Sequence, residues 1–526
     1  MCIGSVNDPW LAWEPWRQMF EGCGSMQRIL SMALVVWSVA VSADPLEAPI
    51  EELQAQLASG AFSSVDLVDW NVRRIDAYDQ KGPALNAIQH MNDNARAQAQ
   101  ALDDERERSG PRSLLHGIPV LVKDNYETID APTTAGSAII EGHWPKNDAT
   151  QVARLKAAGA IILAKTTMHE FAFGWTTRGS AFGMTKNPYG LDRHAGGSSG
   201  GTGAGVAANF GAAGMGSDTC GSIRVPSAHN NLVGLRGTQG LSSRQGIVPL
   251  SSSRDIGGPL ARSTRDLAIM LDATVGYDPA DPQTTESRGK IPDSYLADLH
   301  DIDLTRLRLG VLNDWFEDDE STNARIRHVL ATLAEGGASI VEITDLAELK
   351  AETRGSVAFL VDDYDVVHDL TAYLRRHPNL PVQSFEAVAA HDRLEPVVAG
   401  HWANILAAPE RKSRAAYLEA HAAGAALRRQ LLALMHDHEV DALVYPTATE
   451  EAAPLGEEQG HFNCKLAAAS GLPAISVPAG FGANGMPVAI EFLAEAWAEQ
   501  KLLNLAATVE QLVPVRRLPR STPALD

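Results

Sequence analysis

Apolar and polar positions alternate in blocks along most of the chain. Short, mostly apolar runs predict strands buried on both faces, and they occupy residues 118–122, 161–163, 307–312, 339–343, 442–445 and 474–477. Segments with the period of an amphipathic helix lie between them, at residues 48–60, 64–78, 150–158 and 323–334. Helices that alternate with apolar strands predict an α/β layered fold around a central, largely parallel sheet.

The first 43 residues follow a different pattern. Residues 1–25 contain three tryptophans without a clear period, and residues 26–43 combine a basic Arg28, an apolar run over 29–41 and small residues before Asp44. This is the architecture of a signal peptide, and the run is shorter than the roughly 20 residues of a membrane span. We therefore expect an exported, periplasmic or secreted protein, with 1–25 a doubtful upstream extension, 26–43 a signal peptide and no stable membrane insertion.

Composition narrows the partners. The 526 residues carry a formal net charge of -21, with a pI near 5.2. Because nucleic-acid-binding proteins show a basic face, we expect no nucleic-acid partner. After the leader only Cys220 and Cys464 remain, which predicts neither a disulfide framework nor a metal site. The pair His436 and His438 ends a helical stretch and is interpreted as a solvated helix terminus, so we expect no metal and no cofactor.

The most distinctive stretch, residues 194–226, reads HAGGSSGGTGAGVAANFGAAGMGSDTCGSIRVP. Glycine permits close approach of the backbone to a bound group. Within this stretch, neither of two phosphate-binding patterns, GxxxxGK[ST] and GxGxxG, is present. What remains is a pair of serine clusters joined by a helix of small residues, predicted over 202–211.

These serine clusters resemble the amidase signature family. GGSSGG is followed by DTCGSIRVPS, and Ser198 precedes Ser222 by 24 positions, as in the family. Upstream, residues 116–125 read HGIPVLVKDN and resemble the family segment that carries a catalytic lysine, here Lys123. The chain is similar to exported bacterial amidases and to peptide amidase. The resemblance implies one large amidase domain over 44–526, with a mixed sheet covered by helices on both faces.

The resemblance also implies roles for individual residues. Ser222 would be the nucleophile, Ser198 a proton relay joined by a cis peptide bond, and Lys123 the final base. A lysine can accept a proton only if its pKa is lowered, and the end of a buried strand supplies the desolvation. Ser199 would give a supporting hydrogen bond.

The turn before Ser222 is expected to bind the oxyanion of the reacting carbonyl. The N–H donors would be those of Thr219, Cys220, Gly221 and Ser222. Ser198 would also contact the substrate. Asp218 and Arg224 would hold the turn in place by hydrogen bonds. Cys220 departs from the family, which usually has glycine there. Because Cys220 has a side chain, the backbone φ at this position need not be positive. We expect its thiol to narrow the pocket that holds the acyl group of the substrate. The alternative is that Cys220, and not Ser222, is the nucleophile.

The expected function is hydrolysis of a linear small-molecule or peptide amide through a serine acyl-enzyme. A histidine-dependent serine hydrolase is the rival, but GxSxG, the pattern around its nucleophile, occurs only inside GGSSGG at 196–201, the stretch that resembles the amidase signature. The alternatives are a glutaminase subunit of a tRNA amidotransferase and a binding protein on an inactive amidase scaffold. Residues 346–441 are mostly helical by pattern and match the family least, so we expect substrate specificity there. A homodimer is left open.

Overall fold

The computed structural model describes residues 44–354, 357–460 and 462–525. The expected upstream extension and signal peptide lie outside these residues. Within the described part of the chain, no helix combines the length and the apolar character needed to cross a bilayer.

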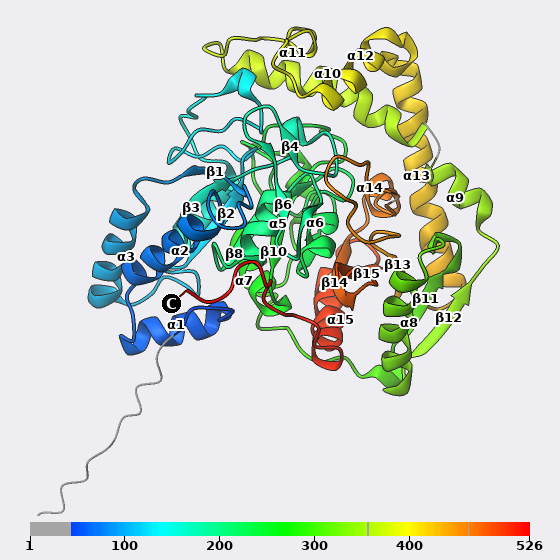
Figure 1. Ribbon diagram of the computed structural model, residues 1–526. Coiled ribbons are helices and arrows are strands. Elements are labelled where there is room, and N and C mark those ends of the chain that lie inside the picture. Colours follow the sequence, from blue (N-terminus) through cyan, green and yellow to red (C-terminus); the bar gives the residue numbers. More distant parts are fainter. Residues whose placement is uncertain (1–43, 355–356, 461, 526) are drawn as a thin grey trace, which may run out of the picture. The chain divides into compact units, whose positions relative to one another are not determined.

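A large sheet forms the centre of the domain (Figure 1). Eleven strands of the described chain pair in the order β1-β3-β2-β8-β10-β9-β14-β15-β13-β11-β12. Their bounds are β1 Ile88–Met91, β2 Pro119–Lys123, β3 Ile161–Thr166, β8 Ala213–Asp218, β9 Val233–Arg236, β10 Ile256–Ala261, β11 Arg308–Leu312, β12 Ser339–Ile343, β13 Ala442–Pro446, β14 Ala474–Phe481 and β15 Pro487–Leu493. Two small hairpins accompany the sheet, β4 Arg178–Gly179 with β5 Gly183–Met184, and β6 Lys186–Asn187 with β7 Gly190–His194. All six apolar runs predicted as strands therefore belong to this sheet.

The sheet is mixed, as expected, but the prediction of mostly parallel strands is wrong. Among the described strands of the large sheet, six pairings are antiparallel and four are parallel. The parallel pairs lie toward the two ends, where helices cross between strands, and the centre is antiparallel. β14 and β15 form a hairpin, and the chain passes from β9 to its neighbour β10 without a helix, so neither pair has a helical crossover. Apolar runs indicate burial, not strand direction.

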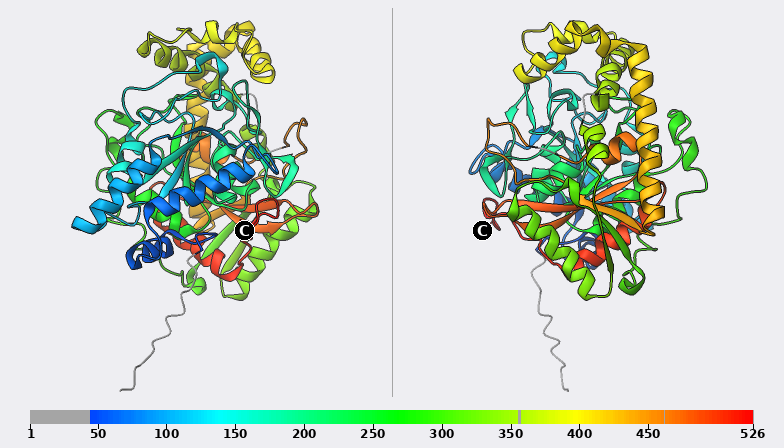
Figure 2. Two further views of the ribbon diagram at one scale, coloured as in Figure 1. Left: turned by 60° about the vertical axis from the view of Figure 1, so that its left-hand side comes forward. Right: turned by 90° about the vertical axis from the view of Figure 1, so that its right-hand side faces the viewer.

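Helices cover both faces of the sheet, as expected (Figures 1 and 2). Alternate residues of β2 show the division, because Val120 and Val122 contribute to one core and Leu121 to the other. The first core is completed by helices α1 Ile50–Ser59, α4 Thr150–Ala157, α7 Thr264–Thr274, α8 Glu320–Glu335 and α15 Glu499–Leu512. The opposite face carries helices α2 Ser64–Tyr78, α3 Ala95–Ser109, α5 Gly200–Ala207, α6 Arg224–His229 and α14 Lys465–Ser470.

The region expected to be variable is helical, as predicted. It contains α9 Ala347–Arg354, α10 Val357–Arg376, α11 Phe385–Ala389, α12 Pro396–Ala407 and α13 Arg414–Asp437. The buried Trp402 of α12 anchors it, with its ring 4.6 Å from that of Phe385 and 5.4 Å from that of Phe171 in the segment after β3. In Figure 1, α13 reaches from this helical group toward β11 and β13. The region thus packs directly on segments that lead to the serine clusters.

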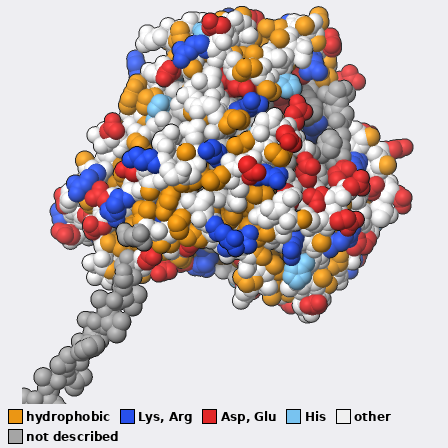
Figure 3. Space-filling model, viewed as in Figure 1, with side chains coloured by type: hydrophobic (Ala, Val, Ile, Leu, Met, Phe, Trp, Pro, Cys, Tyr) orange, Lys and Arg blue, Asp and Glu red, His pale blue; other side chains and the backbone are white. Residues whose placement is uncertain are grey.

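The surface shown in Figure 3 carries charges of both signs. Lysine and arginine side chains are interspersed with aspartate and glutamate on this face. Such a mixture, on a chain of strongly negative net charge, favours solubility.

Candidate active site

Lys123 is the last residue of β2 and is fully buried, as the sequence predicted. Every residue of this strand is buried, so its side chains have no contact with water and the terminal ammonium must find partners inside the protein. Lys123 Nζ donates to Ser198 Oγ at 2.7 Å and to Ser217 Oγ at 2.8 Å. Asn125 Nδ2 donates to the same Ser217 hydroxyl at 3.0 Å. Lys123 is thus held between two serines from different elements.

Ser198 lies in the loop that leads into α5. The Gly197–Ser198 peptide bond is cis, as the family resemblance implied. His169 N donates to the carbonyl oxygen of Ser198 at 2.9 Å, which fixes the backbone of the loop. Ser199 Oγ is linked to the backbone of Ser217 by hydrogen bonds of 3.3 Å, one given and one received, and its supporting role in catalysis stays a prediction.

Helix α5 consists of small residues and packs tightly against the sheet. All eight of its residues are buried. A Cβ on Gly201 would overlap the backbone and hydroxyl of Thr167, which follows β3. The absence of side chains therefore lets the helix approach β3 closely and places Ser198 beside the end of β2.

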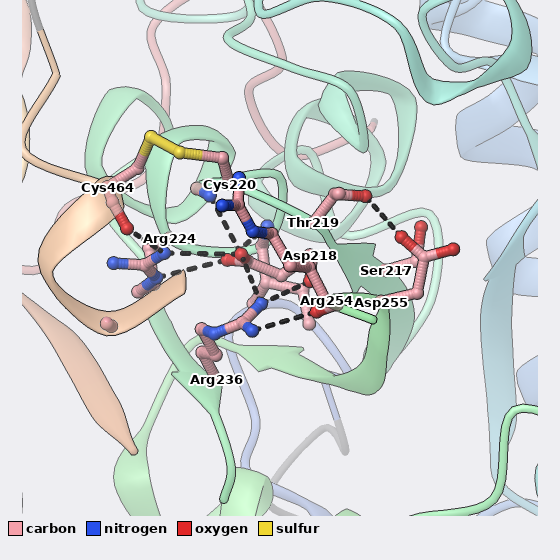
Figure 4. A network of polar contacts seen from close by, with 12 residues as sticks. Ser217, Asp218, Thr219, Cys220, Arg224, Arg236, Arg254, Asp255 and Cys464 are labelled. Atoms are coloured by element: carbon pink, nitrogen blue, oxygen red, sulfur yellow. Dashed lines mark hydrogen bonds and ion pairs between the residues drawn. A yellow bond between two sulfur atoms is a disulfide. The ribbon is translucent and has the colours of Figure 1, made fainter. Parts of the chain in front are cut away.

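Asp218 organises the turn between β8 and α6. Its carboxylate accepts hydrogen bonds from Gly221 N at 2.7 Å and Ile223 N at 3.2 Å. It also pairs with Arg224 at 3.1 Å and with Arg236 at 3.0 Å (Figure 4). Burial alone would raise the pKa of Asp218, but the two guanidinium groups outweigh it and hold the pKa well below its ordinary value. The carboxylate therefore stays charged and fixes the turn, as expected for Asp218 and Arg224.

The backbone N–H groups of this turn divide into two sets. The N–H of Gly221 is occupied by Asp218, so its expected part in binding an oxyanion is wrong for this conformation. In the described chain, the N–H groups of Thr219, Cys220 and Ser222 donate to no protein acceptor. Unpaired N–H groups beside a serine hydroxyl can bind a developing oxyanion.

Ser222 lies in the same turn, just before α6, and is almost fully buried. The structure joins Lys123 to Ser198 directly, but among the described residues no hydrogen bond joins Ser198 to Ser222. Catalytic hydrogen bonds are often formed only when substrate is present. The step from Ser198 to Ser222 therefore stays a prediction.

Comparison with known proteins decides the family. The family model described as Amidase matches residues 66–503, which is most of the chain. The chain belongs to the amidase family. A glutamyl-tRNA(Gln) amidotransferase subunit from Anaeromyxobacter sp. (strain K) is 36% identical over 487 residues, covering 88% of this chain and 95% of that protein.

Solved structures agree with this assignment. Peptide amidase from Stenotrophomonas maltophilia superposes with a TM-score of 0.82 at 33% identity, covering 91% of this amidase and 99% of that chain. The corresponding glutamyl-tRNA(Gln) amidotransferase subunit from Thermotoga maritima gives a TM-score of 0.73 at 26% identity, covering 90% and 97%. The amidase fold and the amidohydrolase class are shared, whereas the relatives differ in the reaction named for them.

The electrostatic setting of Lys123 in this amidase favours its neutral form. Burial lowers the pKa of Lys123 to about 7, although Asp255 and Asp218 act in the opposite direction. Nearby His169 cannot replace it as a base, because burial lowers the pKa of His169 to about 3. Lys123 is therefore the group near Ser198 whose charge changes near neutral pH.

Cys220 does not carry a thiol in this structure. It forms a disulfide with Cys464 across a sequence separation of 244 residues (Figure 4). The expectation of a free thiol that narrows the acyl pocket is wrong, and so is the alternative of Cys220 as nucleophile. Cys220 φ is not positive, as predicted, and the left-handed conformation falls on Gly221, with φ 86°. The disulfide ties the turn to the segment before α14.

A cavity of about 290 Å³ lies against this disulfide. Its aromatic lining includes Trp175, Trp315 and Phe462. Trp175 Nε1 donates to the carbonyl oxygen of Cys220 at 2.8 Å, so the cavity wall is bonded to the turn that carries Ser222. The lining includes Cys464 but neither Ser198 nor Ser222, so the cavity adjoins the disulfide and is joined to the catalytic turn through Trp175.

Several residues of the site were missed by sequence reasoning. Ser217, Arg236 and Glu491 are buried; Arg236 holds Asp218, and Glu491 pairs with Arg224 and accepts from the Tyr445 hydroxyl at 2.9 Å. Ser217 stands directly before Asp218 in the sequence and could have been found from its position at the end of a buried strand. Arg236 and Glu491 lie on β9 and β15, and only the fold brings them to the turn.

Proposed function

We propose that this amidase hydrolyses linear carboxamides to a carboxylic acid and ammonia or an amine. Ser222 is the nucleophile, Ser198 the relay and Lys123 the base. The observation that carries the proposal is the contact of 2.7 Å between Lys123 Nζ and Ser198 Oγ in a fully buried site. A buried lysine whose pKa is lowered to about 7 is neutral in a large share of molecules at physiological pH.

The reaction follows from these positions. Neutral Lys123 takes the proton of the Ser198 hydroxyl while Ser198 takes the proton of Ser222, and Ser222 Oγ forms a bond to the carbonyl carbon. The proton then returns along the same path to the leaving nitrogen, the C–N bond breaks, and ammonia or amine departs. A water molecule repeats the sequence on the ester, which releases the acid and restores Ser222.

The oxyanion is proposed to be bound by backbone N–H groups of Thr219, Cys220 and Ser222. They are the unpaired donors of the turn, and Asp218 keeps the turn in place without contacting the substrate. Preorganised donors of this kind stabilise the charge that develops in the transition state; loss of one donor typically reduces kcat by about 10²-fold or more.

Peptide amides and aryl carboxamides are the proposed substrate classes. The aromatic cavity next to the disulfide suits an apolar or aromatic group, and the resemblance to peptide amidase supports a peptide chain. Residues 346–441, which pack on the segment containing Phe171, are proposed to set the preference among substrates. Short aliphatic and fatty amides are the classes against which this preference should be measured.

We also propose that the protein is exported. The signal-peptide pattern at 26–43 is the first support, and the disulfide between Cys220 and Cys464 is the second, because disulfides persist in oxidising compartments. The alternative of a tRNA amidotransferase subunit is favoured by the relatives that bear that name. The disulfide at the turn that carries Ser222 favours an exported enzyme over a tRNA amidotransferase subunit.

The test is a screen for ammonia release with the disulfide-bonded protein alone. Peptide C-terminal amides, aryl, short aliphatic and fatty carboxamides and free glutamine are compared in wild type and Ser222→Ala. We expect hydrolysis of at least one carboxamide other than glutamine, lost in Ser222→Ala. Release from glutamine only, and only with partner subunits and glutamyl-tRNA, would establish the alternative. Cell fractionation with N-terminal sequencing tests export separately.

A further inference from the structure

Two histidines and a glutamate meet at a point away from the serine clusters. Glu127 follows β2, His143 follows the short helix at Ala138–Ile140, and His377 directly follows α10. One possible ligand atom from each of the three lies within 4.8 Å of the other two. Because His377 is separated from Glu127 by 250 positions, only the docking of α10 on the core creates this cluster.

The contacts within the cluster are close. His377 Nε2 lies 3.0 Å from Glu127 Oε1, and the rings of His143 and His377 have centroids 4.6 Å apart. The Tyr373 hydroxyl donates to the same Glu127 oxygen at 2.9 Å and lies 3.2 Å from His143 Nε2. Tyr373 therefore orients the carboxylate and contacts one of the two imidazoles.

These distances suit a tetrahedral metal ion. Bonds of 2.0–2.1 Å from Zn²⁺ to nitrogen or oxygen place neighbouring ligand atoms about 3.3 Å apart. The separation of 3.0 Å between His377 Nε2 and Glu127 Oε1 is already close to that value, and the ligand atom of His143 lies within 4.8 Å of both, so small side-chain adjustments close the ligand set. A hydrogen bond to a ligating carboxylate, as Tyr373 gives to Glu127, is the usual support of such a ligand.

Access and charge also agree with metal binding. The side chain of His377 is 25% exposed and that of Glu127 11%, so an ion can enter from solvent. A nearby cation, Lys165, is already paired with Asp124 at 3.1 Å. Two imidazoles disfavour Ca²⁺ and Mg²⁺, which prefer oxygen ligands.

We propose that Glu127, His143 and His377 bind one divalent transition-metal ion, with Zn²⁺ as the fitting metal and water as the fourth ligand. The ion links the end of α10 to the segment after β2, the strand whose last residue is Lys123. It thereby fastens the helical region at 346–441 to the core. The site takes no part in the proposed amide hydrolysis, so the two proposals stand or fall separately.

The test is calorimetric titration of the full, disulfide-bonded protein with ZnCl₂ after chelation. We expect one ion per chain, with affinity reduced about tenfold or more in His143→Ala, His377→Ala and Glu127→Gln. The matched control is His436→Ala/His438→Ala, which removes two histidines two positions apart at the end of α13 and is expected to bind Zn²⁺ normally.

A second measurement protects the test against variants that misfold. Co²⁺ added to the wild-type protein should give the intense visible absorption of a tetrahedral centre, and Zn²⁺ should displace it. Absence of binding by wild type, equal affinity in His143→Ala and His377→Ala, or loss of binding in the His436/His438 control would each overturn the proposal.

Discussion

The pH dependence of the amidase is the most direct consequence of where Lys123 lies. If its neutral amine is the base, activity requires the deprotonated form and must fall as pH drops through the pKa of about 7. Below that value each pH unit should lower kcat/KM about tenfold, so that kcat/KM at pH 5 is on the order of 100-fold below its plateau. Above pH 8 the profile should be flat.

The same burial predicts an effect on stability with a definite sign. The pKa of Lys123 is lowered on folding from 10.5 to about 7, so between these values the unfolded chain binds more protons and stability rises with pH. The shift in pKa corresponds to about 5 kcal/mol of the free energy of unfolding. Below pH 7 the folded protein loses this full amount of stability, and above pH 10.5 it loses none of it. Lys123→Met should therefore gain stability relative to wild type at pH 6, by less than this amount because Ser198 and Ser217 lose their partner, and the gain should shrink toward pH 10.

Two measurements check this reasoning. Ammonia release across pH 5–10 gives the kinetic profile, and denaturant unfolding followed by tryptophan fluorescence gives the difference between Lys123→Met and wild type. An inflection near pH 10, or a rate that does not change between pH 5 and 8, would refute the assignment of Lys123 as a neutral base. A stability difference independent of pH would show that its ammonium is not desolvated as the fold indicates.

Three further outcomes are expected. Ser222→Ala should reduce kcat by on the order of 10⁴-fold or more in a folded protein, and a fluorophosphonate should label Ser222; labelling elsewhere, or near-normal turnover, would contradict its role. Ser217→Ala removes an acceptor from Lys123 and should move the kinetic inflection about one pH unit toward acid, whereas an unmoved profile would mean that the contact does not act on the base. Cys464→Ala removes the disulfide that closes a loop of 244 residues and should lower both Tm and kcat/KM. Chain entropy limits the loss in free energy of unfolding to about 5 kcal/mol. A reductant should have the same effect on wild type and no effect on the variant.

Burial was readable from the sequence, whereas direction and distant pairing were not. Apolar runs such as 118–122 become buried strands because side chains on both faces of a wholly apolar run must be removed from water. The burial of Lys123 is predicted from its position at the end of this run. Burial does not depend on which way a neighbouring strand runs, so the antiparallel centre of the sheet could not be foreseen.

The disulfide and the state of the turn show the same limit. Cys220 and Cys464 are brought together by the packing of α14 beside the turn, and their spacing along the chain carries no sign of it. The occupied N–H of Gly221 depends on how the Asp218 side chain bends back, which a motif does not specify. Glu127, His143 and His377 form a cluster only because α10 packs on the core, so the sequence alone could not predict it.

The tight seating of α5 has a consequence for how this enzyme could be altered. Because Gly201 has no room for even a methyl group beside Thr167, a saturation library across 200–207 should lose nearly all variants to misfolding rather than to changed preference. Trp175 lies outside this helix and lines the cavity proposed to bind the substrate. Selection for activity on new amides would therefore leave residues 200–207 unchanged and place its substitutions in the cavity lining around Trp175 and in the helices of 346–441.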